Sequence, residues 1–286
     1  MRWLVTGAGG MLGRDVVTAL DGDRVTALDR AALDVTDADA VAAAVPGHDV
    51  IVNAAAWTDV DGAEAAEAAA TAVNGRGPAN LAAACAASGA ILLHVSTDYV
   101  FAGDAGAPYP EDAPTAPANA YGRGKLAGER AVLGGLPDRG CVVRTAWLYG
   151  THGRNFVATM LRLAGERDTI DVVDDQLGQP TWTYALAERL VALGRAAAAG
   201  TAPAGVYHGT AAGTTTWYGL ARRVFTLAGL NPDRVRPTTT DRFPRPARRP
   251  AYSVLGHARW AAAGLPPMAP WDQMLADALA RWPVPR

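Results

Sequence analysis

Lysine is almost missing from this chain of 286 residues. Lys and Arg together number 26, and every one except Lys125 is Arg. The two side chains differ most where a compact ammonium that can lose its proton is needed, because a guanidinium is planar and stays charged. The single retained lysine therefore indicates a site with such a requirement. The alternative is a surface lysine that arose by chance.

Cysteine is also scarce. Cys85 and Cys141 lie in apolar runs typical of a helix and a strand, without the spacing of metal or redox sites. We expect both to be free buried thiols in a reducing cytoplasm. The motifs GxSxG, HExxH and CxxC are absent, which removes the common hydrolase, zinc and dithiol functions. Met1 and Arg2 lead directly into a strand-like run, so we expect no signal peptide and a soluble cytoplasmic protein.

A large excess of charge is missing too, because the formal net charge is −2. Without a basic field we expect neither nucleic acid nor a membrane surface as a partner. Residues 77–97 carry no formal charge if His94 is neutral, but they are rich in Ala, Gly, Asn and Ser. They predict a helix followed by a strand rather than a membrane span. The length allows one large or two small domains, and because half of all residues are hydrophobic there is ample material for a core.

Glycines are plentiful at the start of the chain. The β-type run 3–6 is followed by Gly7, Gly10 and Gly13, and then by an amphipathic helix through Leu20. A strand, a glycine turn and a helix form the context that a dinucleotide-binding loop requires, although the spacing here is GxxGxxG rather than GxGxxG. We expect a pyrophosphate on the free N–H groups of the helix. The alternative is a plain tight turn. The candidate residues are Gly7, Gly10, Met11, Leu12 and Gly13.

A second strand at 24–28 ends at Asp29 and Arg30. Asp29 lies 16 residues after Gly13, where an acidic residue meets the adenosine ribose of NADH, whereas Arg30 suits the 2′-phosphate of NADPH. A brief strand at 33–35 follows, with Asp34 as a candidate for the adenine edge, Val35 as a further cofactor-binding candidate and Thr36 as the cap of the next helix.

The buried run 49–53 predicts a parallel strand, and Ala54, Ala55 and Ala56 let a flat cofactor lie against the backbone. An acidic helix at 61–70, an alanine-rich helix at 78–87 and a strand at 90–96 come next. Thr97, Asp98 and Tyr99 then emerge at the carboxyl end of that strand, where ligands bind in open α/β sheets.

Tyr121 and Lys125 stand four residues apart in a segment that Asn119 can cap as a helix. Positions i and i+4 share one face of a helix, so the ammonium lies beside the phenol. A neighbouring cation favours the phenolate, which predicts a tyrosine that exchanges protons near neutral pH. The alternative is a packed aromatic side chain.

Strands and helices alternate up to a strand at 141–146, which predicts an α/β fold with a Rossmann-like, doubly wound parallel sheet. After Trp147 the pattern changes: helices at 156–166, 184–199 and 217–228, strands at 170–173 and 205–209, and a polar loop at 174–181. We expect a dinucleotide-binding Rossmann domain of residues 1–150 with about 182–210. A smaller α+β substrate domain is expected from about 151–181 and 211–286.

Together these motifs resemble the extended short-chain dehydrogenase/reductases over nearly the whole chain. More specific strings are STDYVF at 96–101, YGRGKLAGE at 121–129, DDQLGQPT at 174–181, GTTTWY at 213–218 and PARRP at 246–250. Within that superfamily they are similar to the dTDP-4-dehydrorhamnose reductases. Related sugar-nucleotide 4,6-dehydratases place Asp-Glu after the Thr, whereas Asp98 is followed here by Tyr99, which favours simple reduction.

The resemblance implies an NADPH- or NADH-dependent reductase of the C4 keto group of a dTDP-4-keto-6-deoxy sugar. Tyr121 would protonate the developing alkoxide, Lys125 would lower the pKa of the phenol and hold the nicotinamide ribose, and Thr97 would polarise the carbonyl. The residues implied in substrate binding are Thr97, Asp98, Tyr99, Trp147, Gln176, Gln179, Trp217, Arg248 and Arg249.

Several alternatives stay open at this point. Core packing is an alternative for Trp147 and Trp217, and a solvated loop charge for Arg248 and Arg249. The enzyme is either a rhamnose-pathway reductase or a paralogous 4-ketoreductase of an antibiotic sugar pathway, and a catalytically silent regulatory subunit is the third possibility. We expect no bound metal and a monomer or homodimer.

Overall fold

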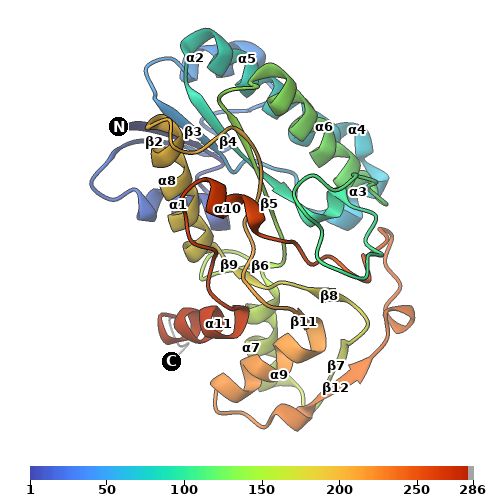
Figure 1. The fold of residues 1–286 in the computed structure, drawn as a ribbon. Coiled ribbons are helices and arrows are strands. Elements are labelled where there is room, and N and C mark those ends of the chain that lie inside the picture. Colours follow the sequence, from blue (N-terminus) through green and yellow to red (C-terminus); the bar gives the residue numbers. More distant parts are fainter. Residues whose placement is uncertain (283–286) are drawn as a thin grey trace.

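The computed structural model describes residues 1–282 and contains the predicted parallel sheet (Figure 1). Its six strands run in the order β10-β5-β4-β3-β1-β2, and every neighbouring pair is parallel. The order steps outward in both directions from the centre, as in a doubly wound fold, so the predicted fold class is confirmed. The strands are β1 (Arg2–Thr6), β2 (Arg24–Leu28), β3 (Val50–Asn53), β4 (Ile91–Thr97), β5 (Gly140–Thr145) and β10 (Gly205–His208).

Helices cover both faces of this sheet. Helices α1 (Met11–Ala19) and α8 (Thr183–Ala198) pack together on one face, and α2 (Ala38–Ala44), α5 (Gly77–Ser88) and α6 (Ala120–Gly135) cover the other. Successive strand residues point to opposite faces. Trp3 and Val5 therefore join the core under α1 and α8, whereas Leu4 joins the core under α2 and α5.

The acidic segment differs from its prediction as one helix over 61–70. It forms α3 (Val60–Ala65) and α4 (Glu67–Thr71), separated at Ala66, whose φ of −134° and ψ of 43° are not helical. A π-helical turn, η1 (Ala72–Arg76), then leads into α5. The cap of α2 is Asp37 instead of Thr36, and its carboxylate accepts from the N–H groups of Asp39 and Ala40. No strand forms at 33–35, where Asp34 closes a local turn onto Thr36.

Most of the chain after Trp147 that is not part of the large sheet or its helices forms a smaller group of helices and short sheets beneath the carboxyl ends of the large sheet (Figure 1). Strand β7 (Ile170–Val173) pairs with β12 (Val235–Thr238), and the polar loop contains strand β8 (Leu177–Gly178), which pairs with β11 (Thr215–Thr216). The other elements of this group are β6 (Leu148–Tyr149), β9 (Thr181–Trp182), α7 (Phe156–Glu166), α9 (Trp217–Leu227), α11 (Trp271–Ala280) and the 3₁₀ turns η3 (Pro232–Arg234) and η4 (Thr240–Arg242). Helix α10 (Ala258–Ala262) packs against β10, and the 3₁₀ turn η2 (Asp98–Val100) packs against α6.

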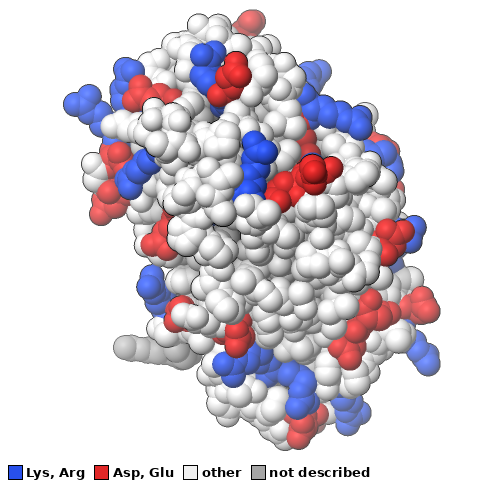
Figure 2. All heavy atoms as spheres, viewed as in Figure 1, with Lys and Arg blue, Asp and Glu red and all other residues white. Residues whose placement is uncertain are grey.

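Helix α8 and strand β10 lie in the segment assigned to the Rossmann domain, and they belong to the large sheet and its cover. The division into two domains itself stays a prediction, and residues 283–286 of its second part lie outside the described residues. Positive and negative side chains are intermixed over the face seen in Figure 2. Within residues 1–282, no helix has the length and hydrophobicity to cross a membrane.

Candidate active site

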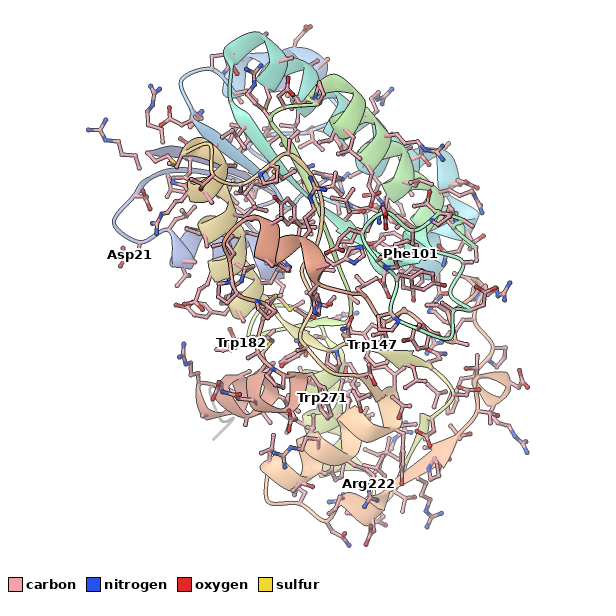
Figure 3. The ribbon with its side chains drawn as sticks, in the orientation of Figure 1. Asp21, Phe101, Trp147, Trp182, Arg222 and Trp271 are labelled. Atoms are coloured by element: carbon pink, nitrogen blue, oxygen red, sulfur yellow. The ribbon has the colours of Figure 1, made fainter. Side chains whose placement is uncertain are left out.

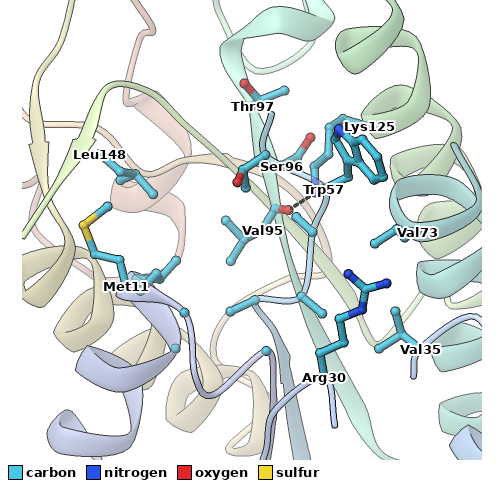
Figure 4. Close-up of a pocket in the computed structure, with 18 of the residues that line it drawn as sticks. Met11, Arg30, Val35, Trp57, Val73, Val95, Ser96, Thr97, Lys125 and Leu148 are labelled. Carbon is cyan, nitrogen blue, oxygen red and sulfur yellow. Dashed lines mark hydrogen bonds between the residues drawn. The ribbon is translucent and has the colours of Figure 1, made fainter. Parts of the chain in front are cut away.

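A cavity of about 1190 Å³ opens at the carboxyl ends of the central strands (Figure 4). Parallel α/β sheets bind their ligands at this edge. All residues predicted to bind the cofactor lie in its wall: Gly7, Gly10, Met11, Leu12, Gly13, Asp29, Arg30, Asp34, Val35, Ala54, Ala55, Ala56, Tyr121 and Lys125. The sequence thus predicted which residues come together, while their contacts with a cofactor stay predictions.

The glycine turn fits a pyrophosphate. Gly7 has a φ of +69°, and a Cβ there would lie 2.5 Å from the backbone nitrogen of Ala55. A Cβ on Gly13 would overlap the carbonyl oxygen of Gly7, so this glycine allows the helix to pack against the turn. Gly10 begins α1 without any side-chain cap. The first N–H groups of the helix are therefore available to an anion, and the helix dipole favours one there.

The polar residues at the end of β2 serve local turns. One oxygen of Asp29 accepts from the N–H groups of Ala31 and Ala32 at 2.9 and 3.0 Å. Asp34 accepts from both the N–H and the hydroxyl of Thr36, and these bonds lower the pKa of its carboxyl. The Arg30 side chain extends along the cavity wall on the side of Val35 (Figure 4). Acidic side chains (Asp29 and Asp34) and a basic one (Arg30) therefore border the end of the cavity where we expect the adenosine of the cofactor.

The three predicted catalytic residues meet at the opposite end of the cavity. Thr97 is the last residue of β4, and Tyr121 and Lys125 lie on α6, whose first turn is capped by Asn119 through a bond from the N–H of Gly122. The Lys125 side chain is 2% exposed, and its Nζ donates to the carbonyl oxygen of Val95 at 2.6 Å (Figure 4). The Thr97 hydroxyl donates to Asp98 Oδ1 at 2.9 Å.

Burial sets the protonation of this cluster in the chain alone. Burial, and to a smaller extent the charge of the Asp98 carboxylate, raise the pKa of Tyr121 to about 12, while Thr97 opposes the rise. Burial lowers the pKa of Lys125 to about 8, against the field of Glu129. In the chain alone, desolvation of the phenolate dominates, and Lys125 is not among the groups that shift this pKa. That Lys125 brings the phenol toward a neutral pKa stays a prediction. The phenol is held as an acid.

Asp98 is a buried carboxyl in the cavity wall, 3% exposed. Burial raises its pKa to about 6, while the nearby Ser253 and the hydrogen bond from the Thr97 hydroxyl oppose the rise. Its second oxygen, Oδ2, has no hydrogen-bond partner among residues 1–282. The sequence predicted Asp98 only as a substrate contact. In the structure its charge also raises the pKa of Tyr121.

Trp147 lies in the cavity wall between the large sheet and the smaller group of elements (Figure 3). Its φ of +49° is unusual for a bulky residue. The ring stacks on Trp217 with centroids 3.7 Å apart and 8° between the planes, and Gly178 leaves room for it. The Trp217 indole donates to Gln176 Oε1 at 3.1 Å. Trp217 and Gln176 therefore stand behind Trp147, outside the cavity wall.

Two further predicted substrate contacts are engaged elsewhere. Gln179 is 2% exposed, and its amide bonds to the backbone of Leu255 and the hydroxyl of Thr210. The Arg249 fork bonds to both oxygens of Asp61 at 2.9 and 2.8 Å, because a carboxylate matches its two parallel donors. Arg248 accepts through its carbonyl oxygen from Asn119. These residues, like Gln176 and Trp217, do not line the cavity, whereas Thr97, Asp98, Tyr99 and Trp147 do.

The cavity also contains residues that sequence reasoning missed, notably Trp57, Ser96 and Arg154. The backbone of Trp57 exchanges two hydrogen bonds with the side-chain amide of the buried Asn74, which fixes the chain beyond the alanines. Its position directly after Ala56 was the available signal. Ser96 precedes Thr97 on the same strand, but its side chain points to α6.

The comparisons with known proteins agree with this geometry. The model of a family described as the RmlD substrate binding domain matches residues 1–283. A dTDP-4-dehydrorhamnose reductase of Streptomyces griseus is 60% identical over 96% of this chain and 92% of its own length. A dTDP-4-keto-6-deoxy-D-glucose reductase of Streptomyces niveus is 54% identical over 97% of this chain and 96% of its own length.

Solved structures give the same result. The structure of a dTDP-4-dehydrorhamnose reductase from Bacillus anthracis in complex with NADP is 36% identical, with a TM-score of 0.93 over 98% of this chain and 99% of that one. That likeness extends over both the large sheet and the smaller group of elements. With a family model and relatives that match almost its full length, this chain belongs to the RmlD substrate binding domain family.

Proposed function

We propose that this chain reduces the C4 keto group of a dTDP-4-keto-6-deoxy sugar with NADPH or NADH, with dTDP-4-dehydro-L-rhamnose as substrate and dTDP-L-rhamnose as product. The observation that supports this most is a single cavity whose wall contains both the glycine turn and the cluster of Thr97, Tyr121 and Lys125. Relatives named as reductases of such sugars support the choice of substrate.

The nicotinamide, when bound, supplies the hydride that adds to the carbonyl carbon. Tyr121 gives its phenolic proton to the carbonyl oxygen, which completes the new hydroxyl group, and burial keeps that phenol protonated at neutral pH. Thr97 places its hydroxyl beside the same position and is oriented by Asp98. A positioned proton donor contributes about 10²–10⁴ in rate.

Lys125 supplies a positive charge where negative charge develops. An ammonium has three donors, and one is used by Val95. The other two are available for the cofactor ribose, as the resemblance implies. Closed surroundings strengthen the field of this charge, since little water screens it.

A second candidate is the C4 reduction of an isomeric 4-keto sugar of an antibiotic pathway. The Streptomyces niveus relative named for dTDP-4-keto-6-deoxy-D-glucose is nearly as similar as the first relative, at 54% against 60% identity. Both reactions use the same cofactor and proton donor, so the sugar end of the cavity decides between them. We further expect a cytoplasmic monomer or homodimer.

The test is oxidation of NADPH or NADH, followed by absorbance, on addition of dTDP-4-keto-6-deoxy-L-mannose or dTDP-4-keto-6-deoxy-D-glucose. We expect faster turnover of the first sugar, with dTDP-L-rhamnose identified by NMR. The Tyr121→Phe variant is the control: it binds the cofactor but loses turnover by about 10²–10⁴. Consumption of neither sugar by the folded protein contradicts the proposed function, and preference for the second sugar selects the second candidate.

A further inference from the structure

Helix α6 carries a buried glutamate, Glu129, one turn beyond Tyr121 and Lys125. Tyr121, Lys125 and Glu129 follow one another at intervals of four residues, so they lie along one face of the helix. Glu129 is 1% exposed and Lys125 is 2% exposed. A buried carboxylate is rare without a partner, and its place next to the only lysine requires an explanation.

The Glu129 carboxylate is held by three hydrogen bonds from the sheet. Oε1 accepts from the Ser96 hydroxyl at 2.5 Å and from Arg144 Nε at 2.9 Å, and Oε2 accepts from Arg144 Nη2 at 2.8 Å. Ser96 on β4 and Arg144 on β5 are register partners, so the two donors sit side by side. The geometry is the two-pronged pairing that fixes a carboxylate in one orientation.

Arg144 is itself fixed on its other side. Its Nη1 donates to the carbonyl oxygen of Glu111 at 3.2 Å and lies 3.5 Å from His208 Nε2. Burial, with the charge of Arg144, lowers the pKa of His208 to about 3, so this ring is neutral and its Nδ1 donates to Gly256 at 2.9 Å. The guanidinium also covers the ring of Phe101, with Cζ 4.8 Å from the centroid.

Lys125 makes no ion pair within residues 1–282, and Val95 is the hydrogen-bond partner of its ammonium there. Glu129 is the anion whose field opposes the effect of burial on Lys125. The other groups that face it are Tyr121 on the same helix, His94 on β4 and, beyond Glu129, Arg144 on β5. Burial and the charge of Lys125 lower the pKa of His94, which is therefore neutral. Asn74 of η1, which packs against α6, is uncharged.

We propose that Glu129, clamped by Arg144 and Ser96, is a positioning residue for Lys125: it keeps the ammonium charged without binding it. A free carboxylate one helical turn away would rotate toward the lysine and take up its donors. The clamp prevents that rotation, so only the field of the carboxylate reaches Lys125 and two N–H groups stay directed at the cavity. The proposal rests on the proposed function for the reaction that Lys125 serves.

Because the chain has one lysine, the proposal has a direct test. Protein grown with lysine labelled at ¹³Cε gives one lysine signal, and its shift with pH reports the pKa of Lys125 without cofactor or substrate. We expect Glu129→Gln to lower this pKa by one to several units, roughly the effect of losing an opposite charge nearby. The double variant Glu129→Gln/Arg144→Gln should show a smaller decrease, because the unpaired guanidinium is removed as well.

Glu67→Gln is the matched control. Glu67 makes the same two-pronged bond to Arg123 on the exposed side of α6, and its loss should leave the lysine titration unchanged. Unchanged titration in folded Glu129→Gln overturns the proposal. If that variant does not fold, as circular dichroism would show, the double variant decides by the same criterion; if neither folds, the pair is a folding element only and the proposal is overturned.

Enzyme activity gives a second, separable measurement. The alkaline limb of the kcat/KM profile should move to lower pH in Glu129→Gln, with more activity retained at acidic than at alkaline pH. A merely structural role would lower activity at every pH alike. Inactivity of the wild type toward both sugars would overturn the proposed function, while the lysine titration would still decide the role of Glu129.

Discussion

Lys125 combines burial with a place in the cavity wall, so its replacement by arginine is informative. The larger, planar group cannot occupy the same space, and we expect Lys125→Arg to lose at least about tenfold in turnover through misplacement of the neighbouring groups. The charged form of Lys125 is lost as the pH rises through its pKa of about 8, whereas arginine stays charged. The alkaline limb of the variant should therefore move up.

Steady-state kinetics between roughly pH 6 and pH 10 measure this effect. The reverse exchange, Arg162→Lys, at an exposed ion pair of α7 is the control and should be silent. A Lys125→Arg enzyme with wild-type rate and profile would show that the ammonium has no special role.

Asp98 has a pKa raised by burial, so its ionisation opposes folding. The folded protein keeps the proton of Asp98 up to about pH 6, whereas the unfolded chain releases it near 3.8. Stability from this group is therefore present below the lower value and is lost as the pH rises through the higher one, by at most about 3 kcal/mol. The free energy of unfolding of Asp98→Asn should therefore increase relative to that of wild type as the pH rises between these two values.

Urea unfolding at several pH values measures that difference. Asp34 provides the contrast, because its bonds to Thr36 lower its pKa and stabilise the ionised form. Asp34→Asn should lose stability relative to wild type as the pH rises, which is the opposite direction. A pH-independent difference for Asp98→Asn would contradict the assigned ionisation.

At the scale of elements, two glycines of the turn between β1 and α1 have different roles: one is needed for cofactor binding and the other for folding. A Cβ on Gly10 would meet only the Gly7 carbonyl oxygen, at 3.3 Å, whereas a Cβ on Gly13 would overlap that oxygen. Gly10→Val should therefore fold and lose cofactor binding, and Gly13→Val should fail to fold. Fluorescence titration with NADPH and thermal unfolding test the pair. Unchanged affinity in Gly10→Val would place the pyrophosphate elsewhere.

Local signals predicted many of the elements. The bounds of α7 and β7 agree with the predicted 156–166 and 170–173, and the cap Asn119 is the residue that the sequence indicated. The break at Ala66 was missed, because alanine is a strong helix former and nothing local interrupts it. Contacts with α6 hold both sides of the break: Glu64 accepts from the Ala120 N–H, and Glu67 pairs with Arg123.

At the scale of the whole molecule, the site residues that the sequence misjudged are those with distant partners. The motifs around Arg249 and Gln179 implied contact with the substrate. In the structure Arg249 instead binds Asp61, 188 positions away, and Gln179 binds Leu255, 76 positions away. The glycine turn and the Tyr121–Lys125 pair were predictable because their geometry follows from short spacings on one element. Packing between elements cannot be read from such spacings.

The Arg249–Asp61 pair joins the proline-rich segment of the smaller group to α3 of the larger one. Burial of Asp61 raises its pKa, but bonds from Arg249 and the Ala247 N–H outweigh this and lower it overall. Arg249→Ala and Asp61→Asn should each cost about 1 kcal/mol, and the double variant should cost little more than either. Arg248 lies outside the cavity wall of the chain alone, but it is exposed and stays the remaining predicted contact for the dTDP pyrophosphate. Arg248→Ala should therefore weaken dTDP binding by about tenfold or more.

Unfolding of Arg249→Ala, Asp61→Asn and the double variant measures the loss of stability. Calorimetric titration of Arg248→Ala and Arg249→Ala with dTDP measures the loss of binding. Strictly additive losses would show that Arg249 and Asp61 act independently. Weaker dTDP binding in Arg249→Ala, with Arg248→Ala unchanged, would exchange the roles of the two arginines.

The burial of the only side-chain amine has a practical consequence. An amine-acylating reagent can reach Lys125 only through the cavity, because the side chain is 2% exposed and the cavity wall contains it. The rate of acylation at this one position is then a measure of whether the cavity is filled. A nicotinamide dinucleotide or a sugar nucleotide that enters should slow it, and a compound that binds to the outer surface should not. Mass measurement of the proteolytic peptide that contains Lys125, which separates this amine from the exposed N-terminal one, would thus rank candidate ligands without any turnover.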